Sequence, residues 1–483
     1  MMMTLAQVAH WIPSARRVGE GATPILRVHT DTRTLQPGDL FVALKGERFD
    51  GNSMLAEARA RGAVAAVAHG GLAAAGLAGV EVPDTLAALG ALAAGWRAQY
   101  TLPLIAVTGS NGKTTVTQMI AAVLAASAGE RALATAGNFN NEIGVPLTVL
   151  RLRAPHQLAV VELGMNHPGE IARLGAIARP TIALVNNAQR EHLEFMATVE
   201  AVARENGSVF TALPADGTAV FPHGDAFTAL WRQLASEEAP RRCLSFGEQA
   251  QADVALVDAQ WQGDAWAVSM RTPLGPLQCQ LHIAGRHNVV NALAATACAL
   301  AAGVSLAHIA QGLSAFAPVK GRSSARLLAG PDGRALTLVD DTYNANPDSM
   351  RAAIDVLAAL PAPRLLVIGD MGEVGDQGPQ FHAEIGAWAR QRGIDTVLAL
   401  GELARDSVTA FAQADGASQT AGTAQHFGDY DALQAAVLAQ LPATASVLVK
   451  GSRFMKMERV VQAIAAQAST APDDNNNKEA GHA

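Results

Sequence analysis

The sequence is poor in cysteine and in aromatic residues. Three cysteines occur among 483 residues, and Cys243, Cys279 and Cys298 have neither an even count nor the spacing of metal ligands. We predict that they are small buried hydrophobes in a reducing compartment, without disulfide bonds. Aromatic residues make up 5% of the chain and apolar residues 49%. Alanine and glycine therefore supply much of the core, which is typical of closely packed helix and sheet layers.

The sequence also lacks a hydrophobic run that is typical of a membrane span. The most apolar segments are residues 62–82, which are interrupted by His69, and residues 292–304, which are too short. Residues 1–17 have no basic region before an apolar run, so they predict a short amphipathic helix rather than a signal peptide. We therefore expect a cytoplasmic protein without membrane insertion.

A strong positive charge is absent as well. The formal net charge is -7, which argues against a broad nucleic-acid surface and means that a polyanionic ligand must be held by a few local cations. A nucleotide fits this pattern better than DNA does. We expect no nucleic-acid partner.

The length predicts about three domains. Up to residue 83, short strands around residues 40–44 and 63–68 flank a helix at 53–61, which indicates a small α/β domain. Residues 84–318 predict a central P-loop ATPase-like domain with a parallel sheet, followed at 253–283 by antiparallel hairpins. Residues 319–467 resume the strand and helix alternation of a Rossmann-like domain, and residues 468–483 are typical of a disordered tail. The predicted fold class is α/β.

The residues after the strand at 104–107 have the composition of a phosphate-binding loop. Glycines allow backbone N–H groups to surround a triphosphate, Lys113 neutralises its outer phosphates, and the Thr114 hydroxyl can reach Mg²⁺. Apolar periodicity after the loop predicts a helix to about residue 126. The candidate ATP-binding residues of the loop are Thr108, Gly109, Ser110, Asn111, Gly112, Lys113, Thr114 and Thr115.

The loop departs from the usual P-loop at its first glycine, because Val107 stands in that position. The shortened form argues against GTPases and motor proteins. The alternative interpretation is a glycine turn beside a solvated lysine, since motif matches include false positives.

Polar residues follow the next strands at the edge where the phosphate loop is expected. Glu162 ends a buried strand and is a candidate Mg²⁺ ligand, because Mg²⁺ prefers hard oxygen donors beside phosphates. His192 lies in a polar segment after the strand at 181–186, where a structural role is equally compatible with the sequence. His287, Asn288 and Asn291 begin a helix and can hold a nucleobase, although capping by Asn288 explains part of this pattern.

Three strand ends of the predicted third domain also carry polar residues. The first of these segments, residues 340–350, contains two aspartates, a tyrosine and two asparagines, and turn chemistry accounts for only its Asn-Pro-Asp portion. Residues 367–373 and 449–453 repeat this placement. We predict a second binding surface that faces the nucleotide domain.

Taken together, these residues resemble the Mur ligases. The resemblance rests on the short loop at 108–115, on the three-domain plan, and on the segments at residues 40–51, 140–146 and 343–347. Within the family, these segments are most similar to the branch that joins D-Ala-D-Ala to UDP-N-acetylmuramoyl-tripeptide. The resemblance implies an ATP- and Mg²⁺-dependent ligase in which an acyl phosphate forms before the dipeptide amine attacks. We expect a monomer whose third domain closes over the site.

The resemblance also implies roles for particular residues. It implies catalytic roles for Lys113, Glu162 and His192. It places His287, Asn288 and Asn291 on the adenine side, Arg322 at a phosphate and Asp341 at the ribose. Candidate substrate contacts are Thr32, Arg33, Lys45, Gly46, Asn140, Asn141, Tyr343, Asn344 and Asn346.

One position departs from the family pattern. Family members often carry a carbamylated lysine that helps to bind a second Mg²⁺, and Asn206 occupies that position here. Either Glu205 supplies the missing negative charge, or the second metal is held by phosphates, water and His192. Our hypothesis is the former, so the candidate metal ligands are Thr114, Glu162, His192 and Glu205.

Three alternatives differ in function. The ligase that adds the third stem-peptide residue is disfavoured because the expected Asp-Asn-Pro-Arg sequence is absent. A folylpoly-γ-glutamate synthetase is disfavoured by the segment at 45–48, which suits an N-terminal UDP-sugar domain. A nucleotide-binding regulatory or scaffold protein without ligation is disfavoured by the polar strand ends of the third domain. The sequence leaves open whether the tripeptide ends in diaminopimelate or in lysine.

Overall fold

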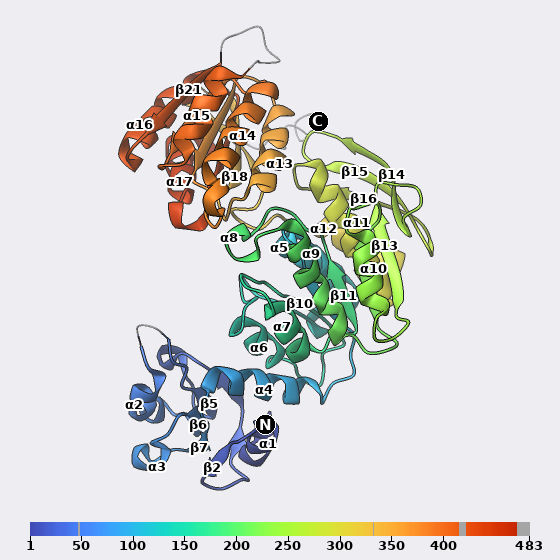
Figure 1. Ribbon diagram of the computed structural model, residues 1–483, viewed down its shortest axis with the longest axis vertical. Coiled ribbons are helices and arrows are strands. Elements are labelled where there is room, and N and C mark those ends of the chain that lie inside the picture. Colours follow the sequence, from blue (N-terminus) through green and yellow to red (C-terminus); the bar gives the residue numbers. More distant parts are fainter. Residues whose placement is uncertain (47–48, 332, 415–421, 471–483) are drawn as a thin grey trace, which may run out of the picture.

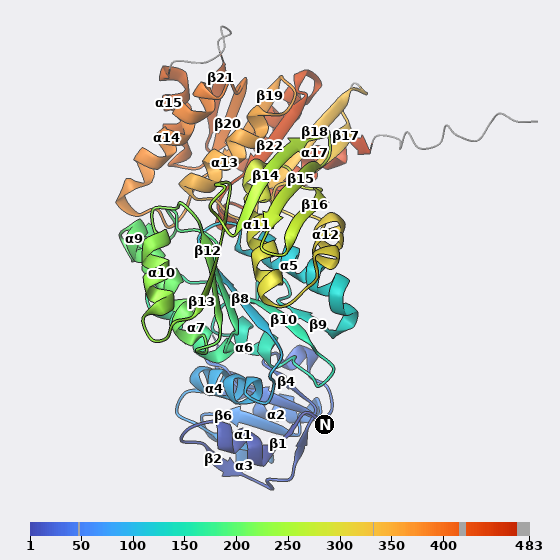
Figure 2. The same ribbon diagram turned by 90° about the vertical axis from the view of Figure 1, so that its right-hand side faces the viewer.

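The protein has three α/β domains that follow one another along its long axis (Figure 1). The computed structural model describes residues 1–46, 49–331, 333–414 and 422–470. The N-terminal and third domains lie at opposite ends, with the central domain between them (Figures 1 and 2). The predicted three-domain α/β fold is confirmed.

The N-terminal domain is built on a five-stranded sheet of order β2-β7-β6-β5-β4, in which only β2 is antiparallel to its neighbour. A separate two-stranded sheet pairs β1 with β3. Glu47 and Arg48, from the segment used against the folate enzyme, lie outside the described residues. The elements are β1 (Met3–Thr4), α1 (Leu5–Trp11), β2 (Arg16–Val18), β3 (Pro24–Ile25), β4 (Arg27–His29), β5 (Asp39–Val42), α2 (Leu55–Ala60), β6 (Ala65–Ala68), α3 (Leu72–Ala75) and β7 (Ala78–Glu81).

Helix α4 (Thr85–Arg97) joins the first two domains and packs against both. The Trp96 ring lies edge-to-face on Trp11 of the N-terminal domain, with centroids 6.2 Å apart. Its indole N–H donates to the Leu152 carbonyl of the central domain at 3.1 Å. Because one buried aromatic residue contacts both domains, a continuous hydrophobic core runs through this junction.

The central domain contains a nine-stranded sheet of order β16-β15-β14-β13-β12-β11-β8-β10-β9. Its strands are parallel from β9 through β14, and β14, β15 and β16 form the predicted antiparallel hairpins. The strands are β8 (Leu104–Thr108), β9 (Ala132–Ala134), β10 (Leu158–Glu162), β11 (Ile182–Val185), β12 (Thr218–Pro222), β13 (Arg242–Gly247), β14 (Val254–Trp261), β15 (Trp266–Thr272) and β16 (Gly275–Leu281).

Helices cover both faces of this sheet (Figure 2). One face packs against α5 (Lys113–Ala128), α11 (Arg286–Ala301) and α12 (Leu306–Ala315). The opposite face packs against α6 (Gly144–Val149), α7 (Glu170–Ala178), α9 (Val199–Gly207) and α10 (Thr228–Ser236). The central parallel strands are therefore buried on both sides, which explains their continuous apolar sequences.

The third domain has a seven-stranded sheet of order β21-β20-β19-β22-β18-β17-β23. Five strands from β21 to β18 are parallel, and β17 and β23 run antiparallel to their neighbours. The elements are β17 (Ser324–Ala329), β18 (Ala335–Asp341), α13 (Pro347–Ala358), β19 (Arg364–Gly369), α14 (Gly378–Gln391), β20 (Thr396–Leu400), α15 (Ala404–Gln413), β21 (Thr423–Phe427), α16 (Tyr430–Gln440), β22 (Ser446–Lys450), α17 (Glu458–Gln467) and β23 (Ser469–Thr470).

The start of the predicted tail belongs to this sheet. Ser469 and Thr470 form β23, which pairs with β17, whereas residues 471–483 lie outside the described part of the chain. None of the helices that the structure describes combines the length and the hydropathy needed to span a bilayer.

Candidate active site

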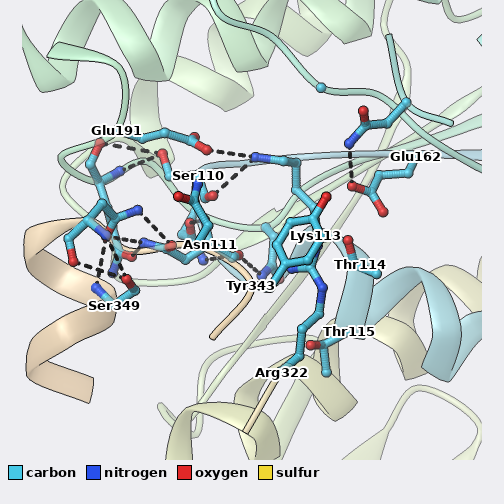
Figure 3. A pocket seen from close by; sticks show the side chains of 18 of the residues that line it. Ser110, Asn111, Lys113, Thr114, Thr115, Glu162, Glu191, Arg322, Tyr343 and Ser349 are labelled. Carbon is cyan, nitrogen blue, oxygen red and sulfur yellow. Dashed lines mark hydrogen bonds and ion pairs between the residues drawn. The ribbon is translucent and has the colours of Figure 1, made fainter. Parts of the chain in front are cut away.

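A cavity of about 740 Å³ lies between the central and third domains (Figure 3). It is situated where the carboxyl ends of β8, β10 and β11 face the third domain, which is the usual place for a ligand in an α/β sheet. The predicted site residues that line it are Ser110, Asn111, Gly112, Lys113, Thr114, Thr115, Asn140, Asn141, Glu162, His192, His287, Asn288, Asn291, Arg322, Asp341, Tyr343, Asn344 and Asn346.

The phosphate loop joins β8 to α5, as the sequence predicts. Gly109 and Gly112 have φ values of 126° and 80°, which glycine adopts without the strain that a Cβ would cause. A Cβ on Gly109 would also lie 3.0 Å from the backbone nitrogens of Asn186 and Asn187. Helix α5 begins at Lys113 in the cavity wall, and the free N–H groups of its first turn favour an anion there.

The Lys113 side chain folds back over its own loop. Its ammonium group donates to the carbonyls of Gly109 at 2.6 Å and Ser110 at 3.1 Å, and to Glu191 Oε1 at 2.9 Å. The Lys113 and Glu191 side chains are 13% and 10% exposed. Burial alone would raise the pKa of Glu191, but Lys113 and His192 outweigh this effect and lower the pKa below its ordinary value.

Three asparagine side chains, two of them buried, hold the backbone of the phosphate loop in place. Asn206 Oδ1 accepts a hydrogen bond from the Gly109 N–H at 2.8 Å, and Asn187 Oδ1 accepts one from the Asn111 N–H at 2.8 Å. Asn186 donates to the Asn111 carbonyl at 2.8 Å. These bonds hold the loop in shape without a ligand, so less ordering is needed when a phosphate binds.

Glu162, at the end of β10, is 1% exposed and lies in the cavity wall. Its Oε1 accepts a hydrogen bond from Asn140 at 2.8 Å. Its Oε2 is buried and has no hydrogen-bond partner among the described residues. A buried carboxylate oxygen without a partner is costly unless a ligand or ion completes it.

His192 connects the central and third domains. It precedes α8 (Leu193–Met196) and has a φ of 50°, a left-handed backbone conformation that is uncommon for residues other than glycine. Its Nδ1 lies 2.5 Å from Glu373 Oε2 of the third domain, and its Nε2 lies 3.4 Å from Glu191 Oε1. Burial alone would lower the pKa of His192, but the two carboxylates outweigh it and raise the pKa to about 9.

The amides expected on the adenine side bind one another. Asn291 donates to Asn288 Oδ1 at 2.9 Å, and Asn186 donates to Asn291 Oδ1 at 3.0 Å. Asn288 also donates to the Ala284 carbonyl at 2.7 Å. Asn186 also donates to the Asn111 carbonyl, so it connects Asn291 of α11 to the phosphate loop.

The third domain supplies the opposite wall of the cavity. The Arg322 guanidinium lies 3.9 Å from the centroid of the Tyr343 ring, and Figure 3 shows both beside the first turn of α5. Asp341 accepts hydrogen bonds from Lys450 at 2.7 Å and from the Ser323 N–H at 2.8 Å. Burial alone would raise the pKa of Asp341, but Lys450 lowers it.

Two further contacts link the domains across the cavity. Asn111 in the phosphate loop exchanges hydrogen bonds with Asn346, which caps α13. Arg190 donates to Asp348 Oδ1 and Glu384 Oε2, both at 2.6 Å. These contacts fix the position of the third domain relative to the phosphate loop.

Several predicted residues do not line this cavity. Thr108 is buried and donates to the Leu184 carbonyl, so it supports the loop rather than contacting a ligand. Gly109 belongs to the loop but does not line the cavity, and its N–H donates to Asn206 Oδ1. The N-terminal candidates Thr32, Arg33, Lys45 and Gly46 lie in the first domain, outside this cavity.

Glu205 also lies elsewhere than expected. Its two carboxylate oxygens accept hydrogen bonds from the backbone N–H groups of Gly169 at 2.8 Å and Ile171 at 2.9 Å, at the start of α7. The carboxylate thus caps a helix and does not face the cavity. Both oxygens of Glu205 are engaged by backbone N–H groups, which corrects our expectation that this residue supplies the negative charge at a metal.

The sequence analysis did not select several residues that the cavity contains. These are Asn186, Asn187, Gln189, Glu191, Ser323, Asp348 and Lys450. Glu191 was detectable as a carboxylate beside His192 in a polar segment after a buried strand. Lys450 was visible as a charged residue at the end of β22, but its partner Asp341 is distant in the sequence.

A shortened phosphate loop at a parallel sheet edge, closed by a Rossmann-like domain, defines a three-domain nucleotide-binding protein. The chain belongs to the Mur ligase family. Residues 107–299 match the Mur ligase middle domain, residues 327–453 match the family described as Mur ligase, glutamate ligase domain, and residues 24–97 match the Mur ligase family, catalytic domain.

Individual relatives are similar over nearly the whole chain. The UDP-N-acetylmuramoyl-tripeptide–D-alanyl-D-alanine ligase of Escherichia coli is 40% identical, over 90% of this chain and 93% of that protein. The crystal structure of MurF from Acinetobacter baumannii has a TM-score of 0.87 and 35% identity, over 96% of this chain and 98% of that one. The Thermotoga maritima MurF ligase, solved in complex with ADP, has a TM-score of 0.78 and 25% identity, over 92% and 98%.

Proposed function

We propose that this protein joins D-Ala-D-Ala to UDP-N-acetylmuramoyl-tripeptide at the expense of ATP and so makes the UDP-muramoyl-pentapeptide of peptidoglycan synthesis. The similarity that carries the proposal is the 40% identity to the Escherichia coli enzyme of this name, which extends over 90% of the chain. ATP use is supported by the related Thermotoga maritima protein with bound ADP. The phosphate loop of this chain lies in the cavity where such a nucleotide would bind.

The chemistry requires an activated carboxyl group. A carboxylate oxygen of the tripeptide attacks the γ-phosphorus of ATP, and ADP leaves. The dipeptide amine then attacks the acyl phosphate carbon, loses a proton and expels phosphate. The loop N–H groups and Lys113 would stabilise the negative charge on the transferred group, which is mainly electrostatic and positional catalysis.

The cavity also fits a divalent cation. In the part of the chain that the structure describes, no group of three or more histidine, cysteine, aspartate or glutamate side chains is arranged to hold a metal by itself. Mg²⁺ usually needs only one or two carboxylates, because substrate phosphates and water complete its coordination. The free Oε2 of Glu162 and the Thr114 hydroxyl are suitable oxygen donors, and His192 lies in the same cavity. A bound Mg²⁺ would neutralise charge on the phosphates.

The resemblance to the Mur ligases implies where the remaining parts of the substrates bind. Asp341 and Arg322 would hold the ribose and a phosphate, with His287, Asn288 and Asn291 on the adenine side. Tyr343, Asn344 and Asn346 of the third domain would face the dipeptide, and Asn140 and Asn141 would lie near the tripeptide end. Thr32, Arg33, Lys45 and Gly46 are proposed contacts of the UDP end in the first domain. The Arg33 side chain is exposed and forms an ion pair with Asp31, two residues before it.

The direct test is phosphate release from ATP with a panel of acceptors. We expect release with UDP-muramoyl-tripeptide and D-Ala-D-Ala together, and none when either is left out. Two tripeptides, ending in diaminopimelate or lysine, would define the acceptor. Release with folate and glutamate instead would contradict the proposal, and so would hydrolysis that needs no acceptor.

A further inference from the structure

Lys113 has no free hydrogen-bond donor in this structure. A lysine ammonium group has three N–H donors, and Lys113 directs them to Gly109 O, Ser110 O and Glu191 Oε1. A phosphate that binds to Lys113 must therefore displace at least one of these partners. Only Glu191 among the three is charged, and it would repel an incoming phosphate.

Of the three partners of Lys113, the Glu191 carboxylate is the one with an unused acceptor oxygen. Its Oε1 binds Lys113, while its Oε2 is buried and has no hydrogen-bond partner among the described residues. The residue is 8% exposed and belongs to the cavity wall. Glu162 Oε2 is unpartnered in the same way, and Figure 3 shows Lys113 between the two carboxylates in this view.

Two buried carboxylates beside a nucleotide phosphate cannot remain uncompensated. If Lys113 turns to the phosphates, Glu191 keeps His192 Nε2 at 3.4 Å from its Oε1, but its buried Oε2 still has no partner among the described residues. One cationic neighbour then faces both this carboxylate and the phosphates, and buried charge that is compensated only in part is unfavourable. A divalent cation removes this penalty, because it can contact carboxylate oxygens and phosphate oxygens together. The same cation cannot bind tightly beforehand, because Glu191 is then neutralised by Lys113.

We propose that Glu191 exchanges partners when nucleotide binds: it releases Lys113 to the phosphates and turns its carboxylate to the divalent cation that accompanies them. Glu191 is then a metal-site residue that forms only in the nucleotide complex. This inference rests on the proposed use of ATP. It explains why an acidic residue lies against the loop lysine, and it makes tight nucleotide binding conditional on the cation.

The test is calorimetric binding of ADP to the full chain, with Mg²⁺ and with a chelator in its place. The readout is the ratio of the dissociation constant without Mg²⁺ to that with Mg²⁺. In Glu191→Gln, ADP binds more tightly without Mg²⁺ than it does to wild type, and the gain from Mg²⁺ is smaller. We expect the ratio to fall at least about fivefold, within the usual range of a coupling between two ligands.

Glu194→Gln is the matched control, because it removes the same charge from an exposed residue outside the cavity. Its ratio should equal that of wild type. An unchanged ratio in Glu191→Gln would overturn the proposal, even if ADP bound more tightly under both conditions, because Glu191 would then only compete for Lys113. Failure of wild type to bind ADP at all would instead refute the proposed function.

A second measurement does not depend on a variant. Mn²⁺ replaces Mg²⁺ as a paramagnetic probe, and its binding to wild type is followed by electron paramagnetic resonance with and without ADP. We expect weak binding of Mn²⁺ alone, and protein-bound Mn²⁺ once ADP is present. Equally tight binding without ADP would contradict the partner exchange.

Discussion

Asn346 of the third domain donates a hydrogen bond of 2.9 Å to Asn111 Oδ1 in the phosphate loop. The contact joins the nucleotide loop to the domain proposed to bring the dipeptide. Asn346→Ser keeps an oxygen that can cap α13, but its side chain is too short to reach Asn111. We expect kcat/KM for the dipeptide to fall about tenfold, since losing a hydrogen bond at this partly buried contact costs about 1 kcal/mol.

The control for this prediction is stability. Because serine is a good capping residue, the melting temperature of Asn346→Ser should remain close to that of wild type. An unchanged kcat/KM would show that the Asn111–Asn346 contact is not needed for dipeptide use.

Asn206 gives a second prediction. Its Oδ1 is the acceptor of the Gly109 N–H, and the residue is 1% exposed. Asn206→Ala leaves this N–H without a partner and loosens the loop, so we expect the dissociation constant of ADP to rise about tenfold. Calorimetry on the folded variant measures this. A lower melting temperature with unchanged ADP affinity would mean that Asn206 supports the fold alone.

Arg190 gives a third prediction, concerning the position of the third domain. Its side chain is 21% exposed and forms ion pairs with Asp348 and Glu384 across the domain boundary. Arg190→Ala should let the third domain move away from the central domain and so increase the radius of gyration measured by small-angle X-ray scattering. High salt should also increase the radius of gyration of wild type, because it screens these ion pairs. Arg204→Ala is the control, because its pair with Glu200 lies within one exposed helix turn. Equal radii for the two variants would contradict this account.

The Asp341–Lys450 pair predicts a pH dependence of stability. The folded pKa of Asp341 is lowered from 3.8, so the pair stabilises the protein above that pH and loses this effect as the pH falls through the lower, folded pKa. Asp341→Asn leaves Lys450 buried without its partner and should cost about 3 kcal/mol near neutral pH. In thermal unfolding, the difference in melting temperature between wild type and Asp341→Asn should become smaller below pH 3.8. A gap that widens in acid would contradict the assigned direction.

The sequence predicted the features that depend on neighbouring residues. The loop from β8 to α5 was predicted from its glycines and hydroxyl residues, which are adjacent in the sequence. The buried strands of the parallel sheet were predicted from short runs of apolar residues. Edge strands were missed: β21 is mostly polar, and β23 pairs with a strand more than a hundred residues away. Such pairing depends on the tertiary fold, so local propensity does not reveal it.

The same limit applies to the site. Residue types at strand ends identified Lys113, Glu162 and His192 as cavity residues, because parallel strands bring their carboxyl ends to one edge. Orientation was not predictable, as Glu205 shows: chemical similarity to a carbamate suggested a metal ligand, but the carboxylate caps α7. The carboxylate that meets Lys113 is Glu191, and this contact exists only in the folded protein.

Lys113 tests the central claim most directly. We predict that wild type releases phosphate only with ATP, UDP-muramoyl-tripeptide and D-Ala-D-Ala together, and that Lys113→Ala lowers this rate by roughly 10²-fold or more while the protein stays folded. Circular dichroism of the variant provides the check on folding. Near-normal, acceptor-dependent phosphate release by folded Lys113→Ala would contradict the assignment of this cavity as the ligation site.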